Sequence, residues 1–492
     1  MAKRTAIIDI GSNSLSIVIY EKSSRFAFHL IEKVRSRVRI GEGAYEKDSY
    51  LQEEAMDKAF GALQDFIFIA QNLKCKKILC VATSALRDAP NKKVFLDRVR
   101  KELKLGIKVI DGKQEAHFGA IAAINLLEPM ESFTTIDIGG GSTELAKVIK
   151  GEVVETLSLD VGTVRLKELF LDKGAKQEEV QAYIKKSISL VPESFKSSHI
   201  VGIGGTIRSL SAVIMRKENY PINSLHSFDY RVKDYKNMIK KIPSLDKASL
   251  KKLDFPTNRL DTIGEGSAIF YRLLKHLDAD VVLSSKAGVR EGVYLNDILR
   301  NANYKFPHNF NVSIKSLIDR FALSEKNCAY VQRVTHDLFD ILAPLHGIGQ
   351  EYKEVLGLAG KLSPISKRIN IYSNSDNSFY FFLENLNFTF SHEKKLMMSL
   401  LLKLSQKEKS RRREYKKYEM LLPEDETMEW LHSMLSLCEC INSNRKIQKV
   451  RFVLEDNHLY VCLEKGLHLC SECIEKLHLP HNLKISVKKL EI

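Results

Sequence analysis

Long hydrophobic runs and a dense cysteine pattern are missing from this sequence, and its first residues do not have the pattern expected of a signal peptide. No apolar stretch approaches the roughly 20 residues that a membrane-spanning helix requires. The chain enters a strand-like segment directly after Met1-Ala2-Lys3-Arg4, without the apolar core of a signal peptide. We therefore expect no transmembrane segment. The 8 cysteines are unevenly spread, so we expect reduced thiols and a cytoplasmic location.

Acidic residues are fewer than basic ones. The chain carries 76 Lys and Arg against 61 Asp and Glu, which gives a formal net charge of +15. Clustered positive charge concentrates anions, so the composition favours a partner such as nucleic acid, an acidic membrane surface or a phosphate polymer. A chain that is basic throughout for no specific reason stays an alternative. With 492 residues, we expect a globular protein of two to four domains.

The pattern of apolar residues changes twice along the chain. Within 3–301, short β-branched strands alternate with helical segments, which predicts an α/β fold. Within 303–434, apolar residues recur at helical spacing and strand signals nearly vanish. After about residue 441, a predicted hairpin turns at 456–458 and a further strand follows. We expect a hinge at 307–312.

Two separate segments repeat one chemical pattern. Each follows a β-branched apolar run and places an aspartate at the end of a strand, ahead of a Gly/Ser turn. Glycines let backbone N–H groups approach an anion closely, and Ser or Thr hydroxyls add donors. The repetition predicts a duplicated fold that holds a phosphate chain and its metal from two sides. The segments are Asp9-Ile10-Gly11-Ser12-Asn13-Ser14 and Asp137-Ile138-Gly139-Gly140-Gly141-Ser142-Thr143.

Further residues suit phosphate chemistry. Gly204-Gly205-Thr206, with Gly202 before it, is a third glycine turn; it opens a predicted helix whose N-terminus is an anion site. Glu115 follows a strand, where a glutamate beside a phosphate can deprotonate an attacking water; an ordinary glutamate in a first helical turn is the alternative.

Three carboxylates are candidate ligands of Mg²⁺, a hard cation that prefers oxygen donors. For Asp9 alone, a turn-capping role is the alternative, which the repeated pattern makes less favoured. The three are Asp9, Asp137 and Glu144.

Together the motifs resemble the exopolyphosphatase / guanosine pentaphosphate phosphohydrolase (Ppx/GppA) family of the actin-like, Hsp70-like and sugar-kinase superfamily. They stand in the family's order and cover about the first 300 residues. Two of the motifs are the repeated segments, and the second of these continues with Glu144-Leu145. The others are Ala-Thr-Ser-Ala-Leu-Arg-Asp-Ala from Ala82, Gly-Lys-Gln-Glu-Ala from Gly112, Gly-Thr-Val-Arg-Leu from Gly162, Gly-Ile-Gly-Gly-Thr from Gly202, Asn-Arg-Leu-Asp from Asn258 and Gly-Val-Arg-Glu-Gly from Gly288.

The resemblance implies an α/β N-terminal half with two ribonuclease-H-like lobes (the actin-like ATPase fold) around a cleft. Residues 1–118 would form lobe I and residues 119–302 lobe II, whose last helix, about 290–301, would pack back on lobe I. Residues 303–436 would form an all-α, HD-like third domain. We expect a small α+β module at 437–492.

The resemblance also implies a function, which is Mg²⁺-dependent hydrolysis of a terminal phosphoanhydride. The substrate would be inorganic polyphosphate, pppGpp or both, with a role in the stringent response, and the protein would be a homodimer. A kinase or chaperone that uses ATP, from the same superfamily, and a non-catalytic polyanion binder stay alternatives. Nucleic acid is not an expected partner.

The implied site has three groups of residues with different roles. Glu115 matches the catalytic glutamate, which activates water, and two arginines near the cleft would neutralise phosphate oxygens. The arginines are Arg87 and Arg290; the phosphate-binding positions are Gly11, Ser12, Asn13, Ser14, Gly139, Gly140, Gly141, Ser142, Thr143, Gly204, Gly205 and Thr206; the metal-side carboxylates are Asp9, Asp137 and Glu144.

The helical region departs from longer members of the family, which carry a metal-binding His–Asp/Glu pair followed by histidines. Ser363 and Pro364 stand in place of the pair, and the following Asn374-Ser375-Asp376-Asn377-Ser378 has no histidine. We therefore expect a helical scaffold without metal chemistry, serving binding or dimerisation.

A basic run and a group of cysteines lie near the C-terminus. The run predicts a surface that guides polyphosphate, with a solvated helix face as the alternative. It comprises Lys403, Lys407, Lys409, Arg411, Arg412, Arg413, Lys416 and Lys417.

The thiols of Cys438, Cys440, Cys470 and Cys473 lie near His468 and His478 in the sequence. Only Cys470 and Cys473 have the spacing found in zinc fingers, so ordinary thiols are favoured over a zinc site.

Overall fold

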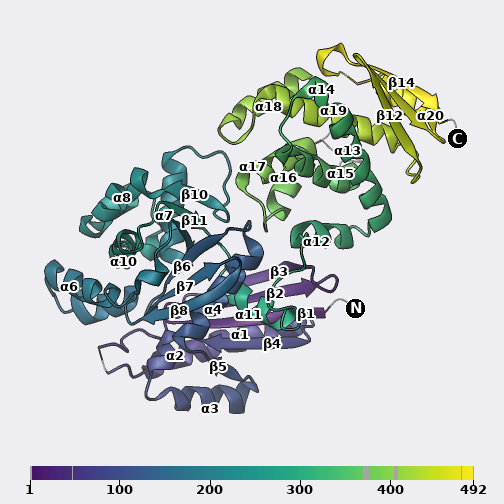
Figure 1. Ribbon diagram of the computed structural model, residues 1–492. Coiled ribbons are helices and arrows are strands. Elements are labelled where there is room, and N and C mark those ends of the chain that lie inside the picture. The colour runs from purple at the N-terminus through teal and green to yellow at the C-terminus, as the bar shows by residue number, and fades with distance from the viewer. Residues whose placement is uncertain (1–2, 47, 370–375, 404–407, 478, 491–492) are drawn as a thin grey trace. The chain divides into compact units, whose positions relative to one another are not determined.

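The chain forms two compact units, Met1–Phe310 and Asn311–Ile492. The computed structural model describes residues 3–46, 48–369, 376–403, 408–477 and 479–490 (Figure 1). The division between the units falls inside the hinge predicted at 307–312.

The first sheet of the N-terminal unit has the strand order β3-β2-β1-β4-β5. β1 pairs antiparallel with β2 and parallel with β4, and Ile7, Ile8 and Ile10 of β1 are fully buried, as its β-branched sequence predicts. The strands are β1 (Lys3–Gly11), β2 (Ser14–Lys22), β3 (Phe28–Ser36), β4 (Lys77–Ala82) and β5 (Ile107–Val109); the helices are α1 (Glu53–Asn72), α2 (Ser84–Asp88) and α3 (Lys92–Leu103).

The second sheet repeats this order and adds one strand. Read from β8, it runs β8-β7-β6-β9-β11-β10, with β6 antiparallel to β7 and parallel to β9. The strands are β6 (Ser132–Ile138), β7 (Thr143–Ile149), β8 (Glu152–Leu159), β9 (His199–Ile203), β10 (Phe228–Arg231) and β11 (Val281–Ser284). The helices are α5 (Thr163–Leu166), α6 (Gln177–Ile188), α7 (Gly204–Lys217), α8 (Val232–Lys241), α9 (Lys247–Lys252) and α10 (Ile263–His276), and a π-helical turn follows α5 at Lys167–Leu171. The duplicated α/β architecture predicted from the sequence is confirmed.

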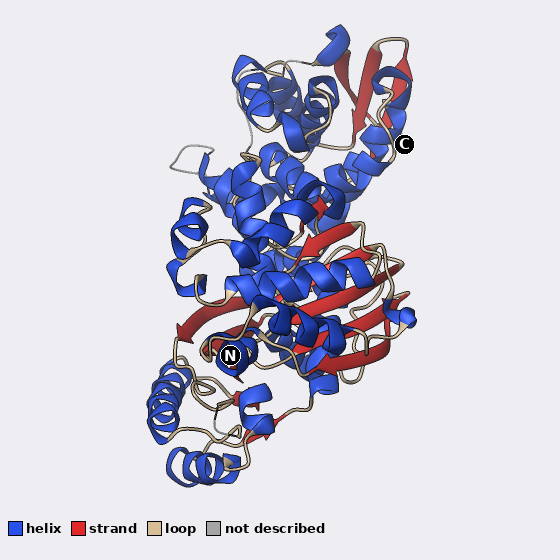
Figure 2. Cartoon of the chain, turned by 90° about the vertical axis from the view of Figure 1, so that its left-hand side faces the viewer, coloured by secondary structure: helices blue, strands red, loops and turns tan. Residues whose placement is uncertain are grey.

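Two helices are exchanged between the sheets. α4 (Gly112–Leu126) follows the first sheet but packs on β6, β7 and β8 of the second, whereas α11 (Val289–Ile298) follows the second and packs on β1. Figure 2 shows helices lying across the strands of this unit. The two helices also contact each other closely, because a Cβ at Gly292 would collide with the backbone of Phe118. This exchange places the start of α4, with Glu115, against the second sheet.

The second unit begins with helices and ends in a small sheet. Its helices are α12 (Val312–Arg320), α13 (Glu325–Ile341), α14 (Ala343–His346), α15 (Glu351–Ile369), α16 (Asp376–Asn385), α17 (His392–Leu401), α18 (Glu408–Lys417) and α19 (Asp425–Ile441). β12 (Val450–Glu455) and β13 (His458–Leu463) form the predicted hairpin, and β14 (Lys484–Lys489) pairs parallel with β13 after α20 (Leu467–Ile474). An HD-like relationship for the helical part stays a prediction.

The position that replaces the family's metal-binding pair lies inside α15. Ser363 is fully buried and donates hydrogen bonds to Glu439 and to the carbonyl of Gly360. Pro364 follows it within the helix. Of the segment 374–378, residues 374 and 375 lie outside the described residues.

The prediction of reduced cysteines is wrong at one pair. Cys440 of α19 and Cys473 of α20 form a disulfide, with their Cα atoms 5.4 Å apart. The two helices pack against each other, which brings together cysteines that are 33 positions apart in the sequence. Cys438 and Cys470 remain free thiols and are buried. His478 lies outside the described residues, and no group of three metal-binding side chains converges among the others.

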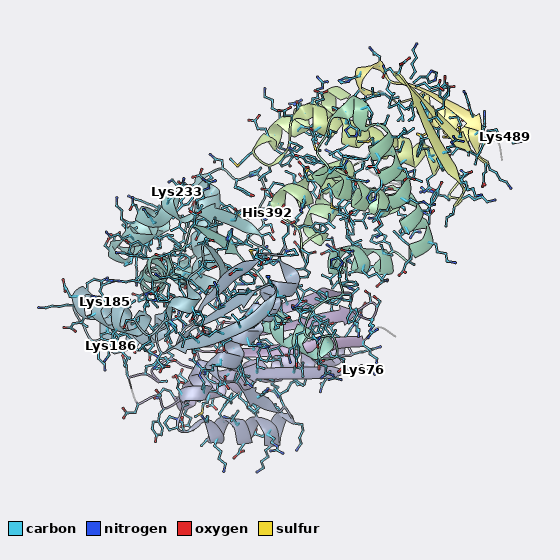
Figure 3. The ribbon with its side chains drawn as sticks, in the orientation of Figure 1. Lys76, Lys185, Lys186, Lys233, His392 and Lys489 are labelled. Atoms are coloured by element: carbon cyan, nitrogen blue, oxygen red, sulfur yellow. A yellow bond between two sulfur atoms is a disulfide. The ribbon has the colours of Figure 1, made fainter. Side chains whose placement is uncertain are left out.

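The basic run at 403–417 is partly neutralised within the second unit. Lys403 is 7% exposed and pairs with Glu414, and Arg411 pairs with Glu429 at 2.6 Å. Other basic side chains project from many elements, as the labelled Lys76, Lys185 and Lys489 show in Figure 3. Much of the positive charge is therefore dispersed. No described helix is long and apolar enough to cross a bilayer.

Candidate active site

The first of the two predicted phosphate-binding segments forms the turn between β1 and β2. Gly11 and Ser14 are paired at the ends of the two strands, which leaves Ser12 and Asn13 in the turn. The Ser12 hydroxyl lies 2.8 Å from the hydroxyl of Ser84 at the start of α2. Asp9 sits two residues before Gly11 and opposite Ser16, so the carboxylate and the turn share one hairpin.

The second predicted phosphate-binding segment forms the turn between β6 and β7. Gly139 N–H donates to the carbonyl of Ser142 at 2.9 Å, and the N–H groups of Val164 and Arg165 donate to the carbonyl of Gly140 at 2.8 and 3.0 Å. The start of α5 therefore fixes this turn from behind. Thr143 donates its hydroxyl to the carbonyl of Val161 at 2.6 Å, so that group is engaged away from the turn.

The two turns lie against each other. A Cβ built at Gly140 would be 3.0 Å from the Cβ of Ser12. A Cβ at Gly141 would collide with the hydroxyl of Tyr45 and lie 2.8 Å from that of Ser84. Glycine is therefore required at Gly141 for the approach of the two lobes. The duplicated hairpins meet, as the repeated sequence pattern predicts.

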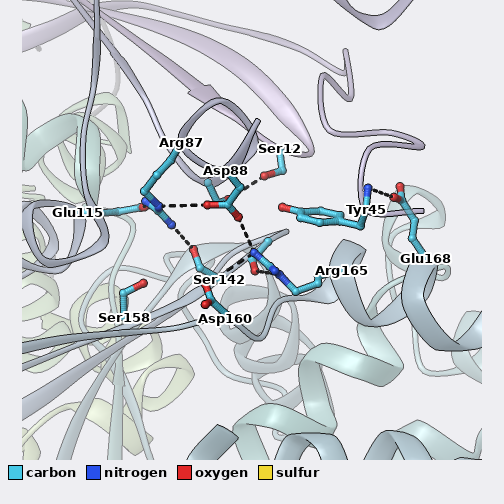
Figure 4. A network of polar contacts seen from close by, with 12 residues as sticks. Ser12, Tyr45, Arg87, Asp88, Glu115, Ser142, Ser158, Asp160, Arg165 and Glu168 are labelled. Atoms are coloured by element: carbon cyan, nitrogen blue, oxygen red, sulfur yellow. Dashed lines mark hydrogen bonds and ion pairs between the residues drawn. The ribbon is translucent and has the colours of Figure 1, made fainter. Parts of the chain in front are cut away.

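Arg87 connects three of the predicted site residues. Its guanidinium donates to Glu115 at 3.0 Å and to the hydroxyl of Ser142 at 3.1 Å, and it lies 3.9 Å from the carboxylate of Glu144 (Figure 4). Ser158 on β8 donates to Glu144 at 3.0 Å. α2, α4 and the β6–β7 hairpin thus bring an arginine, two carboxylates and a serine to one point.

The carboxyl groups of this cluster hold their protons more tightly than usual. Burial and the neighbouring charge of Glu144 raise the pKa of Glu115 well above its ordinary value, against the opposing effect of Arg87. Burial raises the pKa of Glu144 to about 7 and that of Asp137 to about 6. A carboxylate whose pKa lies near neutrality is a stronger base than a surface one and still ionises at physiological pH.

The two exchanged helices begin with the same Gly-x-x-Glu pattern, but the pKa values of the two glutamates are shifted in opposite directions. Gly112-Lys113-Gln114-Glu115 opens α4 and Gly288-Val289-Arg290-Glu291 opens α11. Glu291 accepts hydrogen bonds from Tyr20 at 2.9 Å and from the N–H of Gly288 at 2.8 Å. Although burial opposes the effect, Arg290 and these donors lower the pKa of Glu291. Glu291 is therefore a satisfied structural carboxylate, whereas Glu115 is the basic one.

Asp9 and Asp137 are suited to a divalent cation. Neither carboxylate accepts a hydrogen bond or makes an ion pair within the described ranges, and the charge of Asp9 helps to raise the pKa of Asp137. Across the strands, Asp137 is paired with Glu144. No three such side chains among the described residues are close enough to enclose a metal alone. Mg²⁺ commonly binds one or two carboxylates together with substrate phosphate and water, so the donor set fits it.

The third glycine turn supports this carboxylate. Gly204 opens α7 with a φ of +84°, and a Cβ there would collide with Asp137. A Cβ at Gly205 would collide with the guanidinium of Arg259. Thr206 is buried. The turn therefore lies beside the second hairpin, with an arginine over it.

Basic side chains gather on the Asp9 side of the hairpins. Arg290 donates to the hydroxyl of Ser16 at 3.1 Å and does not join the Arg87–Glu115 cluster. None of the group makes an ion pair with a carboxylate in the described part of the chain. Partial desolvation and the charge of Arg290 lower the pKa of Lys33 to about 8, and desolvation lowers that of Arg259 to about 10. The group, which we call the basic cluster, is Lys33, Arg35, Arg208, Arg259 and Arg290.

A comparison with known families decides the relationship. The model of the family described as "Ppx/GppA phosphatase family" matches residues 18–301, more than half of the chain. The chain belongs to the Ppx/GppA phosphatase family. The match ends just before the second unit begins, so the family's common part is the unit that holds the two hairpins.

Curated Ppx/GppA relatives match the same part of the chain. It is 27% identical over 315 residues to exopolyphosphatase 2 of Mycobacterium tuberculosis, covering 60% of this chain and 98% of that protein. It is 27% identical over 345 residues to guanosine-5'-triphosphate,3'-diphosphate pyrophosphatase of Pseudoalteromonas translucida, covering 68% and 66%. With the bifunctional 3-dehydroquinate synthase/phosphatase of Fusobacterium nucleatum, the identity is 28% over 311 residues, and the chain spans only 46% of that relative's length.

A solved structure of the family agrees. The crystal structure of the Aquifex aeolicus Ppx/GppA family member superposes with a TM-score of 0.52 at 26% identity, covering 61% of this chain and 99% of that chain.

Several residues of this Ppx/GppA site could not be picked out from the sequence. Ser84 and Arg165 stand inside recognised motifs, but nothing in a motif says which partner they contact. Tyr45 and Glu168 lie outside every motif. In the basic cluster, Arg259 and Arg290 stand in recognised motifs, whereas Lys33 and Arg35 come from β3 and Arg208 from α7, and only the folded sheets bring the five together.

Proposed function

We propose that this protein is a Mg²⁺-dependent phosphoanhydride hydrolase that releases terminal orthophosphate from inorganic polyphosphate, from pppGpp, or from both. One observation carries the proposal. Two duplicated glycine turns meet beside Glu115, a buried carboxylate whose pKa is raised and whose position is fixed by Arg87. The arrangement suits a reaction that needs little covalent work from the protein and depends on positioning and charge.

In this mechanism the two turns hold the phosphoryl group. The backbone N–H groups of Ser12–Asn13 and Gly140–Gly141, with the hydroxyls of Ser12 and Ser142, would donate to its oxygens. Arg87 already contacts Ser142 and would add positive charge on the same side.

Glu115 would orient the attacking water and take its proton. Burial and the charge of Glu144 make this carboxylate more basic, an effect that Arg87 only partly opposes, and the Arg87 hydrogen bond holds the carboxylate in place. With the water between Glu115 and the phosphoryl group, its oxygen would attack the phosphorus in line with the leaving phosphate. The proton passes to a Glu115 carboxylate oxygen as the new P–O bond forms and the anhydride bond breaks.

Asp9, Asp137 and Glu144 would hold the Mg²⁺. When bound, the cation would neutralise charge on the transferred phosphoryl group and its leaving oxygen. Among the described residues, no hydrogen-bond donor or ion-pair partner would compete with the cation for the carboxylate oxygens of Asp9 and Asp137.

The basic cluster supports a substrate with several phosphates. The arginines and the lysine of this cluster make no ion pair with a carboxylate in the described part of the chain and lie on the Asp9 side of the hairpins, where further phosphates of a chain would bind. One relative is named an exopolyphosphatase and another a guanosine-5'-triphosphate,3'-diphosphate pyrophosphatase, and both names fit a terminal phosphoanhydride. Dimer formation and a role for the second unit stay predictions.

The test is phosphate release by the purified full chain with Mg²⁺. Long-chain polyphosphate, pppGpp and ATP are supplied separately and inorganic phosphate is measured over time. Release from polyphosphate or pppGpp well above that from ATP supports the proposal. Release from ATP alone would instead favour a kinase-like or chaperone-like ATPase, and no release from any of the three would favour a polyanion binder.

A further inference from the structure

The segment 39–45 connects the first lobe to the second beside the two glycine turns. The N–H of Gly41 donates to the carbonyl of Ser12 at 3.2 Å, which ties the segment to the first lobe. The carboxylate of Glu168, on the second lobe, accepts from the N–H groups of Gly43 at 2.9 Å and Tyr45 at 3.1 Å. The segment is therefore fixed from both sides.

Ion pairs add to this connection. Arg39 pairs with Asp261 of the second lobe at 2.7 Å. Arg165 of the second lobe pairs with Asp88 of the first, and also donates to the carbonyl of Gly141 at 2.7 Å. The guanidinium of Arg165 lies over the ring of Tyr45, 4.7 Å from its centroid. Tyr45 thus has a defined place only while both lobes contribute their contacts.

The hydroxyl of Tyr45 is directed at the second glycine turn. Tyr45 is 7% exposed, its hydroxyl is close enough to Gly141 to exclude a Cβ there, and Figure 4 shows it between Ser12 and Arg165. No hydrogen bond of good geometry reaches this oxygen among the described residues, although the hydroxyls of Ser12 and Ser84 lie near enough to lower the pKa of the phenol. The nearby hydroxyls of Ser12 and Ser84 are bonded to each other.

An unpaired buried hydroxyl is unfavourable, and an anionic oxygen would satisfy it. Burial raises the pKa of the Tyr45 phenol, although Arg165 and the nearby hydroxyls of Ser12 and Ser84 oppose the effect, so the group keeps its proton at neutral pH and acts as a donor. The cationic side chain of Arg165 adds a favourable field for an anion at the same place.

We infer that Tyr45 is a phosphoryl-binding residue of this chain, donating its hydroxyl to a phosphate oxygen held at the turn Gly139–Ser142. The inference rests on the proposed function. The segment 39–45 presents this donor only when Glu168 holds it, so phosphate binding and closure of the two lobes favour each other. Tyr45 thereby supplements the hydroxyls of Ser12 and Ser142.

The direct test replaces Tyr45 by Phe, which keeps the ring and its contact with Arg165. Loss of one hydrogen bond to a charged oxygen should lower kcat/KM by about ten- to a hundredfold and raise the inhibition constant of orthophosphate by a similar factor. Tyr50→Phe is the matched control, because Tyr50 is 49% exposed and close in sequence. Activity and phosphate inhibition within twofold of the unmodified protein for Tyr45→Phe would overturn the inference.

A double-variant cycle tests the part played by Glu168. Glu168→Ala leaves two buried N–H groups of the segment unpaired and should lower phosphate affinity by about the same factor as Tyr45→Phe. Combining the two substitutions should add little, because both remove one donor. Losses that multiply fully would show that the residues act separately and would overturn the coupling.

Binding separates failure of this inference from failure of the proposed function. If the unmodified protein hydrolyses none of the substrates, the proposed function is wrong, and calorimetric binding of orthophosphate to the unmodified protein and Tyr45→Phe still decides the role of Tyr45. Weaker binding in the variant supports it. Equal binding, or none to either protein, contradicts it.

Discussion

Replacing Glu144 by Gln should stabilise the metal-free protein above neutral pH and change its stability little in mild acid. Glu144 is 2% exposed, with Ser158 as a hydrogen-bond donor at 3.0 Å and Arg87 at 3.9 Å. Burial raises the pKa of its carboxyl from 4.5 to about 7, with a contribution from Asp137. Above that pH the folded protein carries a buried negative charge that a glutamine side chain would not have.

The direction and size follow from the two pKa values. Because the unfolded chain releases this proton near pH 4.5 and the folded chain only near pH 7, the contribution to stability is present at low pH and is lost as pH rises between them. At about 1.4 kcal/mol per pKa unit, the loss is about 3 kcal/mol above pH 7 and below about 1 kcal/mol at pH 5. The advantage of Glu144→Gln should therefore grow by about 2 to 3 kcal/mol between about pH 5 and pH 8.

The measurement is urea unfolding in EDTA at both pH values, followed by circular dichroism. Trp430, the chain's single tryptophan, lies in the second unit, so its fluorescence records that unit's transition separately. Glu265→Gln is the matched control, because burial also raises the pKa of Glu265 to about 7 on α10, outside the acid cluster. It should show the same pH-dependent gain without a loss of hydrolysis. An advantage for Glu144→Gln that is equal at both pH values would refute the reasoning.

Two further predictions concern close packing and the disulfide. Gly141→Ala places a Cβ against Tyr45 and Ser84 and should lower the rate of hydrolysis more than tenfold, because one misplaced group in an active site can lower the rate by about 10². Gly61→Ala, which adds a Cβ in open space on α1, should leave the activity unchanged. Equal activity of the two variants would contradict this account. Cys473→Ser should lower the stability of the second unit by about 3 to 4 kcal/mol in the chain-entropy model, for a 33-residue separation, as followed by Trp430 fluorescence in urea. Dithiothreitol should have the same effect on the unmodified protein, and no change with either treatment would show that the bond contributes nothing.

The duplicated hairpins could be predicted because each is encoded in one short segment. The apolar strand, the terminal aspartate and the glycine turn follow one another in sequence, so local patterns were sufficient to anticipate that two such sites exist. That they lie against each other was an inference from repetition, and the contact of Gly140 with Ser12 shows it in space. Glu115 was placed in the site through the family resemblance, and its ion pair with Arg87 joins positions 28 residues apart.

The remaining features depend on contacts that sequence patterns do not record. Glu168 holds Tyr45 from 123 positions away, and neither residue stands in a motif. The pairing of Cys440 with Cys473 depends on how α19 and α20 pack, which cysteine spacing alone does not reveal. The basic run at 403–417 looked like a continuous charged surface, yet Lys403 and Arg411 turn inward to glutamates of the same unit. Charge in a sequence indicates a surface only when the partners of each side chain are known.

The most direct test of the account is the turnover of Glu115→Gln on whichever of polyphosphate or pppGpp the unmodified protein hydrolyses faster. Glutamine keeps the size and a hydrogen-bonding oxygen for Arg87 but cannot accept the proton of the attacking water. The account predicts that kcat falls by about 10² to 10⁴, while orthophosphate binding and the urea midpoint stay close to those of the unmodified protein. A folded Glu115→Gln variant with nearly full turnover would contradict the claim that Glu115 activates the water.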